Sequence, residues 1–128
     1  MRLIEYKRKA DVQRDMDLIR ELLLRIEQDP RTNGKEWVQV DWTGMNHSQE
    51  EIAYHLGILV QADLIRANVT GSMPMVSSLT WDGHEFLDNI KDVGVWRQVK
   101  VRIAGLPGLA LPVIAKIAEA EIMKKLGL

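Results

Sequence analysis

Residues 48–80, SQEEIAYHLGILVQADLIRANVTGSMPMVSSLT, decide the fold of this 128-residue chain. They open with a helix start signal, because the Ser48 hydroxyl can accept a hydrogen bond from the Glu51 N–H while the Glu51 carboxylate accepts one from the Ser48 N–H. Apolar residues then recur about once per helical turn, which predicts a helix with one buried face: Ile52, Leu56, Leu59 and Leu64.

A turn and a hairpin are predicted after this helix. Asp63 stands where the chain must turn, and aspartate tolerates a left-handed backbone better than most residues. Residues 65–70 alternate apolar and polar side chains, as a half-buried strand does. Gly71 and Ser72 supply the turn, and the return strand ends at Thr80, which can cap the next helix. A long helix followed by such a hairpin indicates the helix and wing of a winged-helix domain.

Three segments carry a family resemblance: RDMDLIRELLLRIE (14–27), EEIAYHLGILVQADLI (50–65) and LTWDGHEFLDNIKD (79–92). They resemble small bacterial and phage-borne proteins described as a domain of unknown function. The resemblance runs from about Arg14 to the C-terminus, implies a winged-helix fold and implies no known activity. Asp63 departs from the pattern, since relatives usually carry glycine there. We therefore expect an N-terminal extension (1–13) and a single winged-helix domain (14–128).

The first half of the chain predicts a helix and a short strand. A helix starts at Asp15 or Asp17 and stops before Pro30, because a residue that precedes proline avoids the helical region. Residues 36–42 alternate in polarity, so Val38–Trp42 is predicted to pair with the hairpin as a short third strand. Only TGMNH (43–47) then precedes Ser48. The first helix of a helix-turn-helix is therefore reduced to a turn.

The C-terminal part is predicted to be helical, which makes the fold class α+β and mostly helical. Helices are expected over 81–91 and 95–103, with a break at 105–108 and a last helix from Pro112 onward. Trp81 and Trp96 fall on apolar stripes and are predicted to lie in the core. Trp37 is predicted to be exposed on its strand.

Composition excludes several classes of protein. The formal net charge of −1 and a pI near 6.3 give no global attraction to nucleic acid or to anionic membranes. The absence of cysteine excludes disulfides and thiolate metal sites. No apolar run approaches a membrane span, and the N-terminus lacks the apolar core of a secretory signal. We expect a cytoplasmic protein.

No catalytic motif appears in the sequence. His47 and His55 lie two helical turns apart, too far for a helical metal pair, and His84 lies elsewhere. His55 could pair with Glu51. The carboxylates near helix starts are explained by capping. We therefore expect no enzyme activity, no cofactor and no metal.

The charge of the long helix bears on nucleic-acid binding. No lysine or arginine lies between Lys35 and Arg66, whereas phosphate contacts normally need such residues. The outward face is predicted to carry Glu50, Glu51, Tyr54, His55, Ile58 and Gln61. If DNA is bound, contacts are expected from the basic residues of the N-terminal extension or from Arg66, Arg97, Lys100 and Arg102.

Two functions remain open at this point. The fold resemblance favours a DNA-binding transcriptional regulator, whereas the charge favours a protein–protein or self-association module that has lost DNA binding. For the second, a homodimer is expected through an apolar surface made of Met73, Met75, Ile114, Ile117 and Ile122. The alternative is that the last helix closes the core and the hairpin tip folds back.

Overall fold

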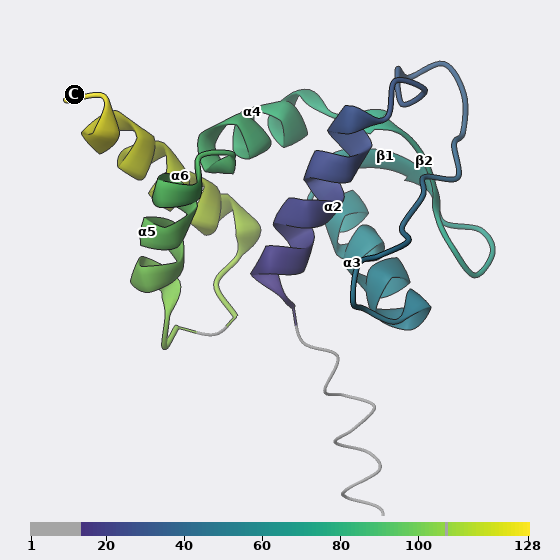
Figure 1. Ribbon diagram of the computed structural model, residues 1–128, viewed down its shortest axis with the longest axis horizontal. Coiled ribbons are helices and arrows are strands. Elements are labelled where there is room, and N and C mark those ends of the chain that lie inside the picture. Colours follow the sequence, from purple (N-terminus) through teal and green to yellow (C-terminus); the bar gives the residue numbers. More distant parts are fainter. Residues whose placement is uncertain (1–13, 107) are drawn as a thin grey trace, which may run out of the picture.

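The computed structural model describes residues 14–106 and 108–128, and the predicted extension (1–13) lies outside the described residues. Within these ranges the fold is α+β and mostly helical, with five helices and one two-stranded antiparallel sheet. The elements are α2 (Met16–Gln28), α3 (Gln49–Gln61), β1 (Ile65–Asn68), β2 (Met75–Leu79), α4 (Trp81–Ile90), α5 (Val93–Ile103) and α6 (Leu111–Lys125) (Figure 1).

Helix α3 begins as the sequence predicts. The Ser48 side chain accepts a hydrogen bond from the Glu51 amide at 3.1 Å, and the Ser48 amide donates to the Glu51 carboxylate at 2.9 Å. At the other end, Asp63 adopts a left-handed conformation with φ of 60°. Both predictions are confirmed, and together they fix where α3 starts and where the chain turns into β1.

Thr80 ties this turn to the start of α4. Its amide donates to the carbonyl of Leu64 at 3.0 Å, and its hydroxyl donates to the carbonyl of Asp63 at 2.6 Å. The same hydroxyl accepts a hydrogen bond from the Gly83 amide at 2.9 Å, which is the predicted helix cap. One side chain therefore holds the α3–β1 turn and the first turn of α4 together.

The sheet is smaller than predicted. β1 and β2 pair antiparallel, with an irregularity between Arg66 and Ala67. The predicted third strand, Val38–Trp42, pairs only at Val38, which exchanges two backbone hydrogen bonds of 2.8 Å with Val76. In that register Val40 would lie opposite Pro74, and proline has no N–H to donate. The prediction of a longer third strand is therefore wrong beyond Val38.

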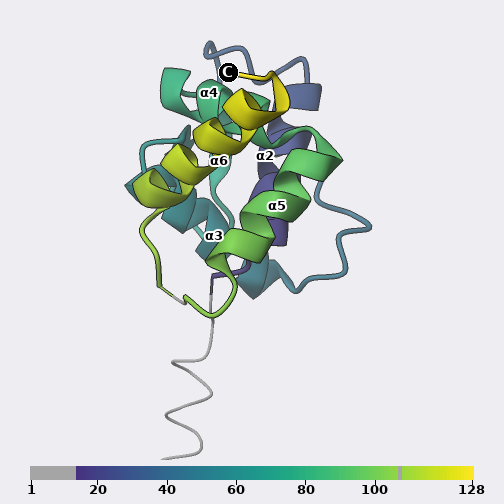
Figure 2. The same cartoon turned by 90° about the vertical axis from the view of Figure 1, so that its left-hand side faces the viewer.

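Helix α2 runs through the middle of the molecule. It packs against α3, β2 and α4, and α3 with the sheet lies on one side of it while α5 and α6 lie on the other (Figure 1). Its predicted apolar stripe is buried. Helices α5 and α6 pack side by side and α6 also packs on α4 (Figure 2). The last helix therefore closes the core against α4 and α5.

The two tryptophans predicted for the core differ. Trp96 is buried, whereas Trp81 is 77% exposed. The buried stripe of α4 contains Gly83, Phe86, Leu87 and Ile90. Trp81 precedes Gly83 by two residues, about 200° around a helix, so it faces away from that stripe. Trp37, predicted to be exposed, is 50% exposed.

Candidate interaction surface

The outward face of α3 is polar, acidic and aromatic. It carries Gln49, Glu50, Tyr54 and Gln61, all exposed, with Ile58 half-buried beside them. The helix contains no lysine or arginine. Glu51 is also half-exposed, and its carboxyl has a pKa below the ordinary value, chiefly because the Ser48 amide donates a hydrogen bond to it. The charge of this face is therefore negative.

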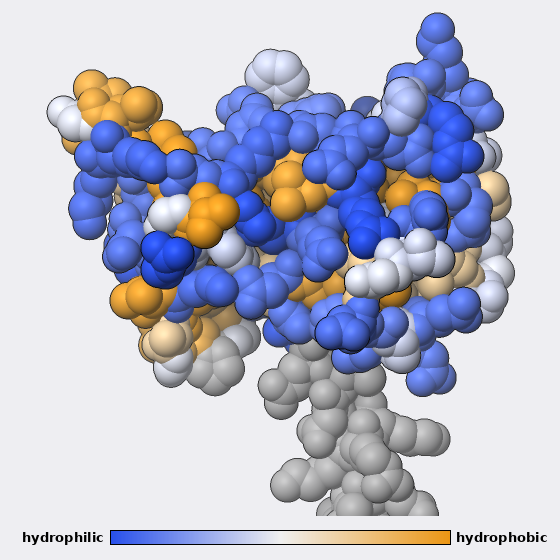
Figure 3. Space-filling view, viewed as in Figure 1, coloured by the Kyte–Doolittle hydropathy of each residue, from blue (hydrophilic) through white to orange (hydrophobic). Residues whose placement is uncertain are grey.

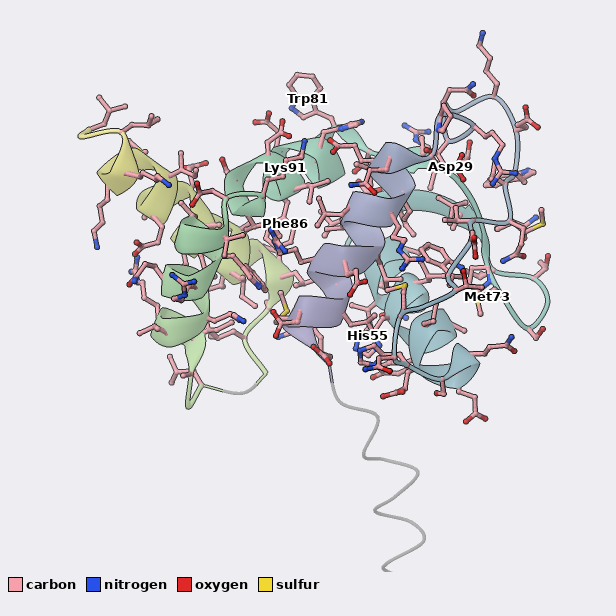
Figure 4. All side chains as sticks on the ribbon, viewed as in Figure 1. Asp29, His55, Met73, Trp81, Phe86 and Lys91 are labelled. Atoms are coloured by element: carbon pink, nitrogen blue, oxygen red, sulfur yellow. The ribbon has the colours of Figure 1, made fainter. Side chains whose placement is uncertain are left out.

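His55 does not lie on that face, contrary to the sequence prediction. Its ring is 1% exposed and lies at the N-terminal end of α2 (Figure 4). Nε2 accepts a hydrogen bond from the Asp15 amide at 2.8 Å, so the ring hydrogen is on Nδ1, which donates to the Glu51 carbonyl at 2.7 Å. The histidine joins two helices, and the predicted pairing with Glu51 is made through its backbone.

The four basic residues predicted to contact DNA do not form one surface. Arg66 is exposed on β1, whereas Arg97, Lys100 and Arg102 are on α5, on the other side of α2 (Figure 1). Arg97 is exposed. Lys100 pairs with Asp17 at 3.0 Å, and Arg102 pairs with the buried carboxylate of Glu121 at 2.9 Å. Two of the four charges are therefore neutralised within the chain.

Asp17 is well placed to keep Lys100 neutralised. Partial burial raises the pKa of the Asp17 carboxyl, but hydrogen bonds from the Trp96 indole and the Lys100 ammonium outweigh it, so the pKa lies below its ordinary value. The indole bond is 2.7 Å long. This cluster joins α2 to α5.

The predicted interface residues lie closer to the core than expected. Ile114 is 1% exposed, so the prediction that it contributes surface to a partner is wrong: it faces the core from α6. Met73, Ile117 and Ile122 are half-buried and pack against the core, and Met75 is half-buried on β2. The exposed apolar residues of this region are Val113, Met123, Leu126 and Leu128, and apolar surface gathers at the end of α6 (Figure 3).

A groove separates the segment before α3 from the tip of the hairpin. It measures about 910 Å³, and we call it the hairpin groove. Gln39–Gln49 form one wall, with Ile52, while Ser72 and Met73 form the other. Figure 4 labels Met73 at the tip of the hairpin. This groove was not among the features predicted from the sequence. Pro74, directly before β2, was the available signal, because a proline cannot donate the hydrogen bond that further pairing would need.

Within residues 14–106 and 108–128, no three histidine, aspartate or glutamate side chains lie close enough together to hold a metal ion. None of the helices in the same ranges combines the length and apolar character needed to cross a membrane.

Comparison with known proteins places the chain in a family. The family described as "Hypothetical protein (DUF2513)" matches residues 13–109, which is more than half of the sequence. The chain belongs to the DUF2513 family. A protein of Haemophilus influenzae described as "Uncharacterized protein" is 33% identical over 120 residues, covering 90% of this chain and 99% of the relative. No solved structure matches.

The DUF2513 match confirms the resemblance seen in the sequence. It starts one residue before Arg14 and contains the AYHL and LTWDGHEF segments. The resemblance was expected to reach the C-terminus, whereas the DUF2513 match ends at Leu109, just before α6. The family match therefore covers α2 to α5.

Proposed function

We propose that this DUF2513 protein is a non-catalytic winged-helix domain that binds another protein and does not read DNA through α3. The order of α2, the Val38 bridge, α3 and the β1–β2 hairpin supports the winged-helix assignment. Residues 43–47, which contain turns only, stand where the first helix of a helix-turn-helix would be.

The observation that carries this proposal is the charge of the outward face of α3. In a winged-helix DNA reader this helix enters the major groove and its neighbours contact phosphates, mostly through arginine and lysine. Here that face presents Glu50 and no cation. Each carboxylate brought near the phosphate backbone adds repulsion, and no released counterions compensate for it.

Exposed aromatic residues support a protein partner. Tyr54 is 47% exposed in the middle of the α3 face, Trp37 is 50% exposed and Trp81 is 77% exposed. Tyrosine and tryptophan are enriched at protein interfaces, where they bury large areas at a low cost in side-chain entropy. The partner is either a second copy of this chain, as a homodimer, or a different protein.

A second candidate is DNA binding through the hairpin. Arg66 is exposed on β1 and makes no ion pair with the described residues, so it could contact phosphate from the wing. This candidate depends on one cation and on the fold analogy.

DNA retention and sedimentation together test the proposal. We expect no retention of a random-sequence duplex at roughly 50 mM salt, or weak retention that disappears near 200 mM because it depends on counterion release. Retention that Arg66→Ala removes and Tyr54→Ala leaves unchanged would favour the second candidate. Sequence-selective binding that Tyr54→Ala removes would contradict the proposal. Sedimentation velocity at micromolar concentration then shows whether the partner is a second copy.

A further inference from the structure

The segment after Val38 keeps the form of a strand although it leaves the sheet. Val38 and Val40 are buried and Trp42 is half-buried, while Trp37, Gln39 and Asp41 are exposed. This alternation is that of an extended chain with one face on the core. The carbonyl of Gln39 accepts from Arg31 at 3.4 Å and that of Asp41 accepts from Arg25 at 2.9 Å. One edge of the segment is therefore held by arginines.

The opposite edge has unused hydrogen-bonding groups. In a strand, the N–H and C=O groups of every second residue point to the same side. Val38 directs both of its groups at Val76, so Val40 and Trp42 direct theirs toward the hairpin as well. Within the described residues, the backbone of Val40 and of Trp42 makes no hydrogen bond. Pro74 and Ser72 occupy the opposite positions in this register, and Pro74 cannot donate.

These groups face the hairpin groove. The most deeply buried residues of its lining are Val40, Met45 and Ile52, so its floor is apolar. Trp42 and Met73, which are half-buried, are also apolar lining residues. Asp41 is the carboxylate of the lining, which contains no lysine or arginine. A volume of about 910 Å³ is within the usual range of roughly 300–1,000 Å³ for ligand sites. The groove thus combines an unpaired strand edge with an apolar floor.

We propose that the hairpin groove binds an extended peptide segment of a partner protein. The peptide pairs its backbone with Val40 and Trp42 and continues the sheet where Pro74 interrupts it, the mode known as strand addition. At about 3.3 Å per residue, the wall formed by residues 39–42 pairs with on the order of four peptide residues. Alternate peptide side chains point at the apolar floor, so the matching sequence has apolar residues at every second position.

The shape of the groove selects this occupant over two others. A phosphate backbone is disfavoured, since Asp41 is present and lysine and arginine are absent from the lining. Walls on both sides, with Ser72 and Met73 facing residues 39–42, admit a single extended chain more readily than the folded sheet of a second copy. The inference rests on the proposed protein-binding function and specifies where and how the partner binds.

The test uses a phage-displayed library of random heptapeptides selected on the full chain. Ser72→Arg places a large charged side chain at the groove, whereas Thr70→Arg makes the same change at an exposed hairpin position that does not line it. We expect the selected peptides to lose affinity by about tenfold or more on Ser72→Arg, and to keep it within about twofold on Thr70→Arg. The amides of Val40 and Trp42 should become protected from hydrogen exchange on binding.

A chemical variant of the peptide isolates the backbone contacts. Two methylated peptides are compared, one with methyl groups on the odd-numbered backbone nitrogens and one with them on the even-numbered nitrogens. One of the two should lose binding and the other should keep it, since only every second amide faces the protein strand. Equal losses in both peptides would overturn strand addition. Peptides that bind Ser72→Arg unchanged and protect amides of α3 would overturn the groove as the site while leaving the proposed protein-binding function in place.

Two further outcomes would also overturn the inference. One is a library that yields no peptide with a preference for the wild-type chain over Ser72→Arg. The other is a peptide-free dimer that Ser72→Arg dissociates and Thr70→Arg does not, which would make a second copy the occupant. DNA reading through α3, by contrast, would contradict the proposed function without affecting peptide binding in the groove.

Discussion

The backbone of Gly83 packs so closely on Leu64 that a Cβ atom at residue 83 would overlap the Leu64 carbonyl oxygen. The same carbonyl accepts the hydrogen bond from the Thr80 amide. The first turn of α4 is thus docked on the α3–β1 turn backbone to backbone. Glycine is required here by the close approach, and the residue belongs to the LTWDGHEF segment that carried the family resemblance.

Gly83→Ala should destabilise the fold. The added methyl group meets main-chain atoms, which cannot rotate away, so α4 must shift, and we expect a loss of about 1–3 kcal/mol. Gly57→Ala is the matched control, because a Cβ there meets no atom within 4 Å and α3 is helical around it. The control should gain about 0.4–1 kcal/mol from the lower entropy of the unfolded chain. Urea unfolding midpoints measure both, and equal effects would contradict the packing argument.

Interactions between residues close in the sequence were predicted well, whereas contacts between distant segments were predicted poorly. Ser48 and Thr80 cap their helices as expected, and Asp63 makes the left-handed turn, because each of these interactions lies within a few residues of chain. Trp81 was misplaced because the apolar stripe of α4 contains a glycine, and Gly83 gives no hydrophobic signal. The end of pairing after Val38 depends on the register with β2, which the sequence does not reveal.

The candidate site was predicted less completely than the fold. A helical pattern shows which side of α3 is polar, and it placed Glu50 and Tyr54 correctly. It could not show that the N-terminus of α2 docks against His55, because Asp15 and His55 are 40 residues apart in the sequence. The hairpin groove was missed for the same reason: its two walls are distant segments of the chain.

His55→Leu should destabilise the junction of α2 and α3. Leucine retains apolar bulk but leaves the Asp15 amide without its acceptor and removes the bond to the Glu51 carbonyl. An unsatisfied buried donor costs about 1–3 kcal/mol. His84→Leu serves as the control, since His84 is exposed on α4, and its effect should stay within about 0.5 kcal/mol. Urea unfolding measures the loss of stability in both variants. If His55→Leu costs as little as His84→Leu, the His55 hydrogen bonds do not stabilise the junction of α2 and α3.

The Asp92–Lys125 pair should make stability depend on pH. The Lys125 ammonium donates a hydrogen bond of 2.6 Å to the Asp92 carboxylate. This bond is the main reason that the pKa of the Asp92 carboxyl lies below its ordinary value of 3.8, and the hydrogen bond from the Val95 amide is the second. A lowered folded-state pKa stabilises the fold above the unfolded value, and this contribution is lost as the pH falls through the folded pKa.

Asp92→Asn tests this pair without removing the cap of α5, because asparagine also caps helices well. The variant should be less stable than wild type at pH 7, and the difference should shrink as the pH drops below 3.8. Glu119→Gln is the control for removing a surface carboxylate, because Glu119 is exposed on α6 and makes no ion pair with the described residues, so its effect at pH 7 should be smaller than that of Asp92→Asn. A constant difference between Asp92→Asn and wild type at all pH values would contradict the assignment.

Helix α6 should be part of the cooperative core although the DUF2513 match ends before it. Ile114 is 1% exposed, whereas its neighbour Val113 is 44% exposed. Ile114→Ala should cost about 2–5 kcal/mol through lost burial and a cavity. Val113→Ala should stay within about 0.5 kcal/mol. Thermal unfolding checks both variants, and a small effect of Ile114→Ala would mean that α6 unfolds independently of the remaining helices.

Two tryptophan substitutions separate a satisfied indole from an unsatisfied one. The Trp96 N–H donates to the Asp17 carboxylate at 2.7 Å, whereas the buried Trp42 N–H has no hydrogen-bond partner among the described residues. Replacing either tryptophan with phenylalanine removes the indole N–H, and the side-chain volume that is lost is the same at both positions. Trp96→Phe also removes a hydrogen bond to a charged group, worth about 1.5–3 kcal/mol, while Trp42→Phe relieves a buried donor. We therefore expect Trp96→Phe to be the more destabilising by at least about 1 kcal/mol in urea unfolding. Equal costs would mean that the Trp42 N–H is satisfied in solution.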